Sequence, residues 1–403
     1  MPYQAYGQRN EIYNERIRTV QTVVNGNWQA MPIMTLGGNN SLTISFDDLT
    51  HNYHRYIYKV EHCEADWSPS TSLFESAYLE GINGATLEDY VKESLNTTVL
   101  YNHYSITIPN RECSLKMSGN YRLTVYDDDI DEKVLSVCFM VVEPIMGVSL
   151  RVSTNTDIDV NRSHQQVDMT VAYSKDNRGK LIVSDPLSQI YTVVMQNGRW
   201  DNAVVNTRPN YIQSDRLVWT HNRDLIFDAG NEYLKFEMFD VHATTMGVDY
   251  TRFISDYYHC FLTPIGMRNN YVYDETPKGA YYIRNWDNYD SDYLCDYEWV
   301  HYKVMSPEVR NNVYLNGNWT NNTFSEEYRM HYNAKEGCYE AAILQKQGYY
   351  SYCLLMDDNG RGVPLPSQGN FYETRNDYAA LVYYKAPSDR SWRLVGYSSV
   401  KIK

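Results

Sequence analysis

The sequence predicts an all-β protein of three stacked antiparallel β-sandwich domains with very little helix, on three observations. Apolar and polar residues alternate in many short segments; in SLTISFDDL, for example, Leu42, Ile44 and Phe46 share one face. Such alternation gives a strand one buried and one solvated face, which is typical of antiparallel sheets. Turn sequences such as SGN, AGN and DDNGRG separate these segments. Tyrosine, which favours strands, occurs 39 times.

Three further segments repeat this alternation and are expected to be strands with one buried face. Their inward residues are Tyr121, Leu123 and Val125, then Leu234, Phe236 and Met238, and finally Val300, Tyr302 and Val304. Helical periodicity is nearly absent, and only Leu87–Leu95 is expected to form short helical turns.

An Asn-Gly pair followed by an aromatic residue occurs as NGNW at Asn25–Trp28 and Asn316–Trp319, and as NGRW at Asn197–Trp200. Both residues of the pair tolerate positive φ, so the pair suits the type I′ turn of a β-hairpin. The residues before each copy are β-branched or aromatic, as in a strand. The recurrence is therefore interpreted as turn chemistry and not as a repeated functional motif.

Two stretches, VVEPIMGVSL and FLTPIGMRNN, are expected to connect domains. Each ends a strand-like run, passes through a proline (Pro144, Pro264) and then reaches a glycine (Gly147, Gly266). Proline interrupts strand pairing and glycine frees the backbone, which suits an inter-domain connection. The predicted domains are an N-terminal β-sandwich at 1–145, a middle β-sandwich at 146–265 and a C-terminal domain at 266–403.

The net charge is −14 at pH 7, with an isoelectric point near 5.2. This balance argues against nucleic acid as a partner and against docking on anionic lipid, because both need clustered Lys and Arg. The longest apolar run, Val134–Val142, is far shorter than the ~20 residues of a membrane-spanning helix. The first residues do not resemble a signal peptide, so we expect either a cytosolic protein or a mature chain whose signal was removed.

The histidines do not form a recognisable metal-binding pattern. His51 lies near His54, and His62 lies near Cys63 and Asp66. Neither group has a further ligand at a standard spacing, and a metal site needs three or four converging ligands.

The acidic run Asp127–Glu132 begins like a calcium-binding loop. It has Glu132 where the loop needs glycine and Cys138 where it needs glutamate, so a solvated acidic turn is predicted. Nucleophile-elbow, phosphate-loop and dinucleotide motifs are absent. We therefore predict a non-enzymatic protein with no catalytic residue, cofactor or metal site, and without a small-molecule ligand.

The seven cysteines are odd in number and contain no C-x-x-C pair, which argues against a zinc site and a complete disulfide framework. Cys338 and Cys353 flank a predicted hairpin with its turn near Gln345–Gly348, so a cross-strand disulfide is one alternative. Buried free thiols are the favoured one, because cysteine packs as a small apolar residue.

Eight segments in a fixed order resemble the type IX secretion system plug protein family of Gram-negative bacteria, over the chain from about Met34 to the C-terminus. They are HCEADWSPS (His62–Ser70), LNTTVLYNHYSITIPN (Leu95–Asn110), KMSGNYRLTVYD (Lys116–Asp127), QNGRWDNAV (Gln196–Val204), GNEYLKFEMFD (Gly230–Asp240), VYLNGNWTNN (Val313–Asn322), ILQKQGYYSYCLL (Ile343–Leu355) and GNFYETRNDYAALVYYK (Gly369–Lys385). None is diagnostic alone, but the ordered set is specific.

The resemblance implies an exported, periplasmic, all-β protein without catalysis. It implies a plug that caps the periplasmic end of the large outer-membrane barrel through which folded cargo leaves, closing the pore when export is idle. The expected partner is that barrel subunit, contacted through edge strands and tyrosine-rich faces. The family defines no catalytic residues, and the surface that meets the barrel stays open.

The last domain is also similar to early-set, immunoglobulin-like modules beside glycogen-active enzymes, some of which bind α-glucans. The matching positions run from Gly317 to Asn322. Trp319 occupies the position of a core aromatic, and Asn322 replaces the tryptophan that stacks on sugar. A periplasmic carbohydrate-binding protein is therefore the alternative function. An outer-membrane barrel is disfavoured by strand charges such as Lys235 and Glu237.

Overall fold

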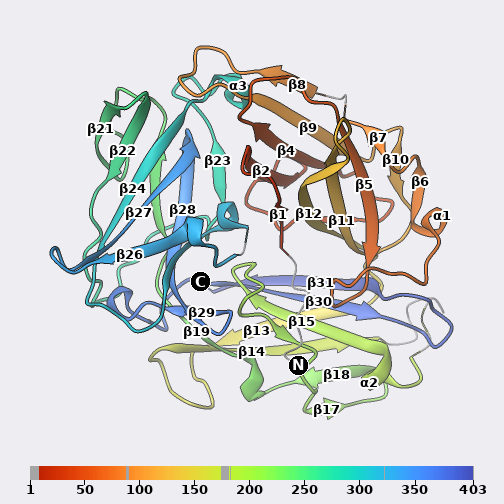
Figure 1. Cartoon of the computed structure of the whole chain (residues 1–403). Helices are drawn as coiled ribbons and strands as arrows, with labels where there is room; N and C mark the ends of the chain where they lie inside the picture. The colour runs from red at the N-terminus through yellow and green to blue at the C-terminus, as the bar shows by residue number, and fades with distance from the viewer. Residues whose placement is uncertain (1–8, 88–89, 174–180, 182, 322, 403) are drawn as a thin grey trace.

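The computed structural model describes residues 9–87, 90–173, 181, 183–321 and 323–402. About 48% of the chain is strand and 6% is helix, so the predicted all-β class is confirmed. Three β-rich lobes are grouped around a common centre (Figure 1), and we name them the N-terminal, middle and C-terminal lobes. In the described part of the chain, no helix has the length and apolar character needed to cross a membrane.

The N-terminal lobe consists of two packed sheets and a small pair of strands. The six-stranded sheet contains β1 (Glu11–Ile12), β12 (Glu132–Val142), β11 (Gly119–Asp127), β5 (Tyr56–Cys63) and β7 (Ala85–Thr86), with β3 (Ile33–Thr35) parallel to β12. The four-stranded sheet contains β2 (Ile17–Val24), β4 (Leu42–Asp48), β9 (Asn102–Ile108) and β8 (Tyr90–Glu93). Helix α1 (Glu75–Tyr78) leads into β6 (Leu79–Gly81), which pairs with β10 (Cys113–Leu115). Leu42, Ile44 and Phe46 are fully buried in the core of this lobe, as their alternation predicted.

The middle lobe is a sandwich of two sheets. One contains β13 (Gly147–Ser153), β14 (His164–Ala172), β18 (Arg216–Trp219) and β17 (Tyr211–Ile212), with β19 (Ile226–Asp228) paired to β14. The other contains β16 (Val204–Val205), β15 (Ile190–Gln196), β30 (Asp377–Tyr384) and β31 (Arg393–Lys401). Short helical turns α2 (Pro186–Gln189) and η1 (Arg223–Leu225) precede β15 and β19.

The C-terminal lobe is one ten-stranded sheet that surrounds an apolar core and ends at β20 and β21. Its order is β20 (Leu234–Met238), β28 (Gly348–Asp358), β25 (Val313–Asn316), β26 (Arg329–Asn333), β27 (Cys338–Lys346), β24 (Tyr297–Met305), β22 (Tyr257–Leu262) and β21 (Val248–Ile254). Two short strands, β23 (Tyr281–Ile283) and β29 (Arg361–Pro364), also pair with β28. The helical turns are α3 (Ser291–Leu294), η2 (Asn318–Thr320), η3 (Glu326–Tyr328) and η4 (Pro366–Gln368).

Strand pairing crosses the domain boundary predicted near residue 265. Strands β30 and β31, from the end of the chain, complete the sheet of β15 in the middle lobe. Conversely, β20 to β22 precede the boundary but pair with β28 and β24 of the C-terminal lobe. Strand pairing thus assigns some residues on each side of position 265 to the other lobe. The division into domains at 1–145, 146–265 and 266–403 stays a prediction.

The helical turns predicted at Leu87–Leu95 are wrong where the structure describes this segment. Residues 90–93 form strand β8, paired with β9, and residues 88–89 lie outside the described residues. The apolar spacing that suggested a helix is weak over nine residues, and pairing with a long neighbouring strand overrides it.

The hairpin predicted between Cys338 and Cys353 is also wrong. Strand β27 pairs with β24 and β26, whereas β28 pairs with β20, β23, β25 and β29. The turn between β27 and β28 therefore carries the chain from one part of the sheet to another and does not place the two strands side by side. Both cysteines are free, as are the other five.

Strands β15 and β30 are buried on both faces and join two lobes. On one face, Val194, Ala380 and Val382 pack into the core of the middle lobe. On the other, Val193 and Leu381 pack with residues of β12 in a shared apolar cluster. A strand buried on both sides has an almost continuous apolar sequence without alternation, which the segment DYAALVYY shows.

The N-terminal and C-terminal lobes meet at a buried charged network. The Lys346 ammonium of β27 lies 2.7 Å from Oδ2 of Asp47 on β4, and both side chains are sealed from solvent. The Tyr297 hydroxyl donates to the same oxygen at 2.6 Å, and Nδ1 of His103 lies 2.6 Å from Oδ1. Burial alone would raise the pKa of Asp47, but the Lys346 charge and these hydrogen bonds lower it.

The middle and C-terminal lobes meet at a second buried ion pair. Arg199, from the NGRW segment, lies 2.5 Å from Asp201 and donates to the carbonyl of Gly362 at 2.8 Å. The Gly362 amide in turn donates to Asp201 at 2.9 Å. Because all three junctions are buried, the lobes form one body whose parts do not slide freely.

Candidate functional site

The three Asn-Gly-x-Trp segments converge on one cavity of about 560 Å³ where the lobes meet. Its wall includes Asn27 and Trp28 from the first copy, Asn197 and Trp200 from the second, and Asn318 from the third. The three copies of the segment therefore lie close together in space, which the sequence did not reveal.

Two of the three copies have the predicted turn geometry. Asn25 and Gly26 have φ of 51° and 71°, and Asn197 and Gly198 have φ of 53° and 67°. The third copy is different, because Gly317 is extended with φ of −166° and precedes η2. A Cβ on Gly317 would lie 2.5 Å from Nε1 of Trp319 and 2.8 Å from the Ser351 carbonyl, so glycine is needed there for close packing.

Several side chains that line the cavity are held in its wall by ring packing and hydrogen bonds. Trp28 stacks on Tyr282 with ring centroids 5.5 Å apart, and Trp200 packs edge-on against Trp67. The Asn197 side chain donates to Asn376 at 2.8 Å and accepts from the amide of residue 377 at 2.9 Å. The cavity is thus a junction between lobes, held by the turns.

One member of the histidine pair, His54, contacts the acidic run. Nδ1 of His54 lies 3.2 Å from Oδ2 of Asp127, the first residue of the acidic run. Arg16 lies 2.5 Å from the same oxygen, and Asp127 is almost completely buried. Asp128, the next residue, pairs instead with Arg55 at the surface. The carboxylates therefore diverge, and the buried one is already balanced by arginine.

His62, Cys63 and Asp66 do not converge. His62 places Nδ1 2.8 Å from the Ser70 hydroxyl, and burial lowers the pKa of its imidazole, which favours the neutral form. Burial raises the pKa of Cys63 to about 12, so its thiol is a weak nucleophile. The Asp66 carboxylate accepts from the amide and hydroxyl of Ser68 in a local turn.

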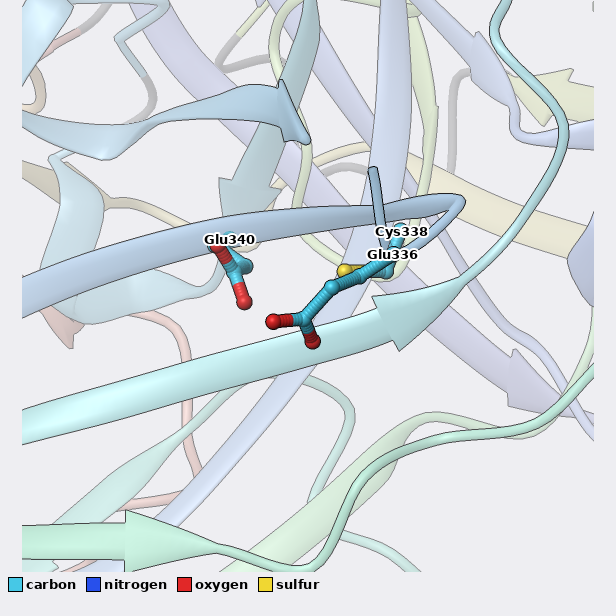
Figure 2. A group of neighbouring side chains, drawn as sticks. All are labelled: Glu336, Cys338 and Glu340. Carbon is cyan, nitrogen blue, oxygen red and sulfur yellow. The ribbon is translucent and has the colours of Figure 1, made fainter. Parts of the chain in front are cut away.

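A different group, Glu336, Cys338 and Glu340, brings potential metal ligands together where β26 turns into β27 (Figure 2). The ammonium of Lys303 on β24 already balances the charge of these carboxylates in place of a metal ion. It contacts Glu336 directly and lies 3.5 Å from Glu340. Burial, followed by the charge of Glu340, raises the pKa of Cys338 and keeps it a thiol. The arrangement is an ion-pair cluster stabilising the turn.

Glu298 is a buried carboxylic acid whose pKa is raised. It is fully buried, and burial raises its pKa to about 7. Its Oε1 accepts from Gln347 at 3.3 Å, while Oε2 has no hydrogen-bond partner. Glu298 does not line the cavity between the lobes, and its burial as a neutral acid affects stability.

An exposed aromatic surface lies on β21, β22 and β24, and sequence reasoning missed it. Tyr250 stacks on Phe261 with centroids 4.5 Å apart, and Phe261 stacks on His301 at 4.2 Å. Nδ1 of His259 lies 2.8 Å from Nε2 of His301. The segment VDYTRFISDYYHCFL contained the signal, since two strand-like runs are separated by Ser-Asp alone.

The early-set likeness assigned Trp319 to the core aromatic position and Asn322 to the position of the sugar-stacking tryptophan. Trp319 is 8% exposed, packs in the core of the C-terminal lobe and donates from Nε1 to the Ser351 carbonyl at 3.0 Å. Asn322 lies outside the described residues. Trp319 therefore acts as the core aromatic that the early-set likeness implied.

Residues 17–143 match the family model described as the first domain of the type 9 secretion system plug protein. The whole chain is similar to a hypothetical protein from Parabacteroides merdae ATCC 43184, known from a crystal structure. The two share 36% identity with a TM-score of 0.93, over 98% of this chain and 100% of that one.

The C-terminal domain of the antigen I/II-family protein AspA from Streptococcus pyogenes is only weakly similar. It has 8% identity and a TM-score of 0.17 over 96% of this chain and 99% of that one, which is too low to indicate a shared fold. No curated protein matches the chain. The matched residues cover most of the N-terminal lobe and contain the first three of the eight ordered segments found in the sequence. The chain belongs to the type IX secretion system plug protein family.

Proposed function

We propose that this chain is a non-enzymatic periplasmic plug, which caps the periplasmic end of the outer-membrane barrel of the type IX secretion system and closes it when no cargo is engaged. The observation that carries the proposal is the match of residues 17–143 to the plug family model.

The buried junctions between the lobes support this role. A wide barrel encloses an aqueous lumen, so closing it requires a body that fills space and resists deformation. The apolar cluster shared by β12, β15 and β30 and the Asp47–Lys346 and Arg199–Asp201 pairs hold the lobes in one arrangement. Such a body obstructs a pore sterically.

The chemistry of the described residues agrees with a passive role. Of the histidines and carboxylates singled out in the sequence, His62 contacts the Ser70 hydroxyl and Asp127 contacts Arg16. The cysteines have raised pKa values where a shift is resolved. A carbohydrate-binding function is not favoured, because Asn322 replaces the tryptophan that stacks on sugar in the glycan-binding modules.

The test is outer-membrane permeability in cells that contain the barrel subunit. Deletion of this chain should admit a large antibiotic that the membrane normally excludes, and re-expression should restore exclusion. The matched control lacks both the barrel subunit and this chain, and it should stay sealed. Equal permeability with and without this chain, in cells whose barrel is present and idle, would refute the plug function.

A further inference from the structure

Strands β21 and β22 form a hairpin at the outer margin of the C-terminal lobe (Figure 1). Its turn consists of Ser255 and Asp256, with φ of 48° and 70°, which is a two-residue type I′ turn. Strand β22 pairs with β24 inside the lobe, whereas β21 ends the sheet.

The outer side of β21 has no backbone partner. Between Asp249 and Ile254, the only backbone ladder in the described part of the chain is the one to β22. The Thr251 hydroxyl donates to the Val241 carbonyl, but this bond involves the side chain and leaves the backbone free. An open edge of this kind can receive another strand.

Several other sheet edges in the described part of the chain are protected. Strands β1, β7, β16 and β17 are only two residues long. Strand β2 is covered by the C-terminal lobe, where the Tyr281 hydroxyl donates to the Val20 carbonyl at 2.8 Å, and β13 and β31 pack on each other. Strand β21 has seven residues and contains neither proline nor lysine. Its one register irregularity lies between Val248 and Tyr250, so the ladder over Thr251–Ile254 is regular.

Hairpin geometry identifies the free groups. In a two-residue hairpin, Ile254 and Tyr257 form a hydrogen-bonded pair, and such pairs alternate along the ladder. The N–H and C=O groups of Thr251 and Phe253 therefore point away from β22, toward the open side. Only an extended backbone presents donors and acceptors at the spacing needed to satisfy them.

The side chains beside this edge suit a protein partner. Phe253 is 58% exposed and Ile254 is 41% exposed. Arg252 lies over the ring of Tyr250, which leaves a mixed aromatic and cationic surface next to the open backbone. Aromatic residues and arginine are enriched where protein partners bind.

We propose that β21 receives an extended β-strand from the barrel subunit of the secretion apparatus, so that the C-terminal lobe docks by strand addition. This inference rests on the proposed plug function and names its contact. The added strand takes its backbone hydrogen bonds from Thr251 and Phe253, and its side chains pack beside Phe253 and Ile254.

The experiment measures binding of the full chain to the purified outer-membrane complex that contains the barrel subunit. Thr251→Pro removes an outward N–H and leaves the ladder to β22 intact, because proline is tolerated on an open edge. Thr251→Val is the matched control, since both variants lose the hydroxyl bond to Val241. We expect Thr251→Pro to weaken binding about tenfold or more, and Thr251→Val to stay within about twofold of the unaltered chain.

A second measurement on the unaltered chain does not depend on how a variant folds. Hydrogen exchange of the peptide spanning 248–256 should slow in the complex, because the outward amides become bonded. Absence of any association overturns both the plug function and this inference. Association with unchanged exchange, or with equal binding by Thr251→Pro and Thr251→Val, overturns the inference alone. Protection that depends only on the concentration of this chain identifies a second copy as the occupant and also overturns it.

Discussion

Lys346 and Asp47 lie 299 positions apart in the chain, yet their charged groups are 2.7 Å apart and fully buried between two lobes. Two ions are removed from water there, and each is tolerated because the other is present. The pair therefore makes the relative position of the N-terminal and C-terminal lobes sensitive to single substitutions.

Removing one member of this pair should destabilise the protein strongly. We expect Lys346→Met to lower the free energy of unfolding by about 3–5 kcal/mol, because Asp47 is left as an unpaired buried charge. Urea denaturation at pH 7 measures the effect. The double variant Asp47→Asn, Lys346→Met should recover part of the loss, and purely additive losses would contradict the coupling.

Glu298 should make the protein less stable as the pH rises. Its folded pKa is about 7, whereas an unfolded glutamate has a pKa of about 4.3. Between these values the folded state keeps a proton that the unfolded state has released, so stability falls as pH rises through this window and then levels off.

Glu298→Gln should remove that decline, because glutamine does not titrate. At pH 8 the variant is expected to be more stable by up to roughly 4 kcal/mol, at about 1.4 kcal/mol per pKa unit, and at pH 4 the two proteins should be alike. Thermal denaturation across this pH range measures it. The exposed Glu308→Gln is the control, and parallel pH profiles for Glu298→Gln and the unaltered chain would disprove the assignment.

Leu381 connects the N-terminal and middle lobes through the apolar cluster with β12. Leu381→Ala should cost about 2–5 kcal/mol, the range for a buried leucine whose site cannot collapse. Chemical denaturation measures the loss, and Ile158→Ala at an exposed position should change stability by less than about 0.5 kcal/mol. If Leu381→Ala lowered the free energy of unfolding by no more than Ile158→Ala does, the apolar cluster would not be closely packed.

Gly317 should not tolerate a side chain. Gly317→Ala introduces a Cβ within 3 Å of Trp319 and Ser351, so we expect a loss of about 1–3 kcal/mol from overpacking. Gly266→Ala is the matched control, because a Cβ there meets no atom within 4 Å. Equal melting temperatures for the two variants would contradict the close contact at Gly317.

Features set by neighbouring residues could be predicted from the sequence. Alternation identified β4, β11, β20 and β24 and their buried residues, except that Leu234 of β20 is only partly buried. It could do so because the two faces of a strand depend on local geometry alone. The Asn-Gly pairs at 25–26 and 197–198 adopt positive φ for the same reason. The ordered segments were sufficient to identify the plug family.

The tertiary structure alone decided how these strands combine. The return of β30 to β15, the separation of β27 from β28, and the pairing of Asp47 with Lys346 join residues that are far apart in the chain or reverse what a nearby turn suggests. The open edge of β21 likewise exists only because no other strand of this chain pairs beside it within the described residues. Local propensity sets the conformation of a segment, but its partners depend on which apolar faces and buried charges are satisfied together across the whole molecule.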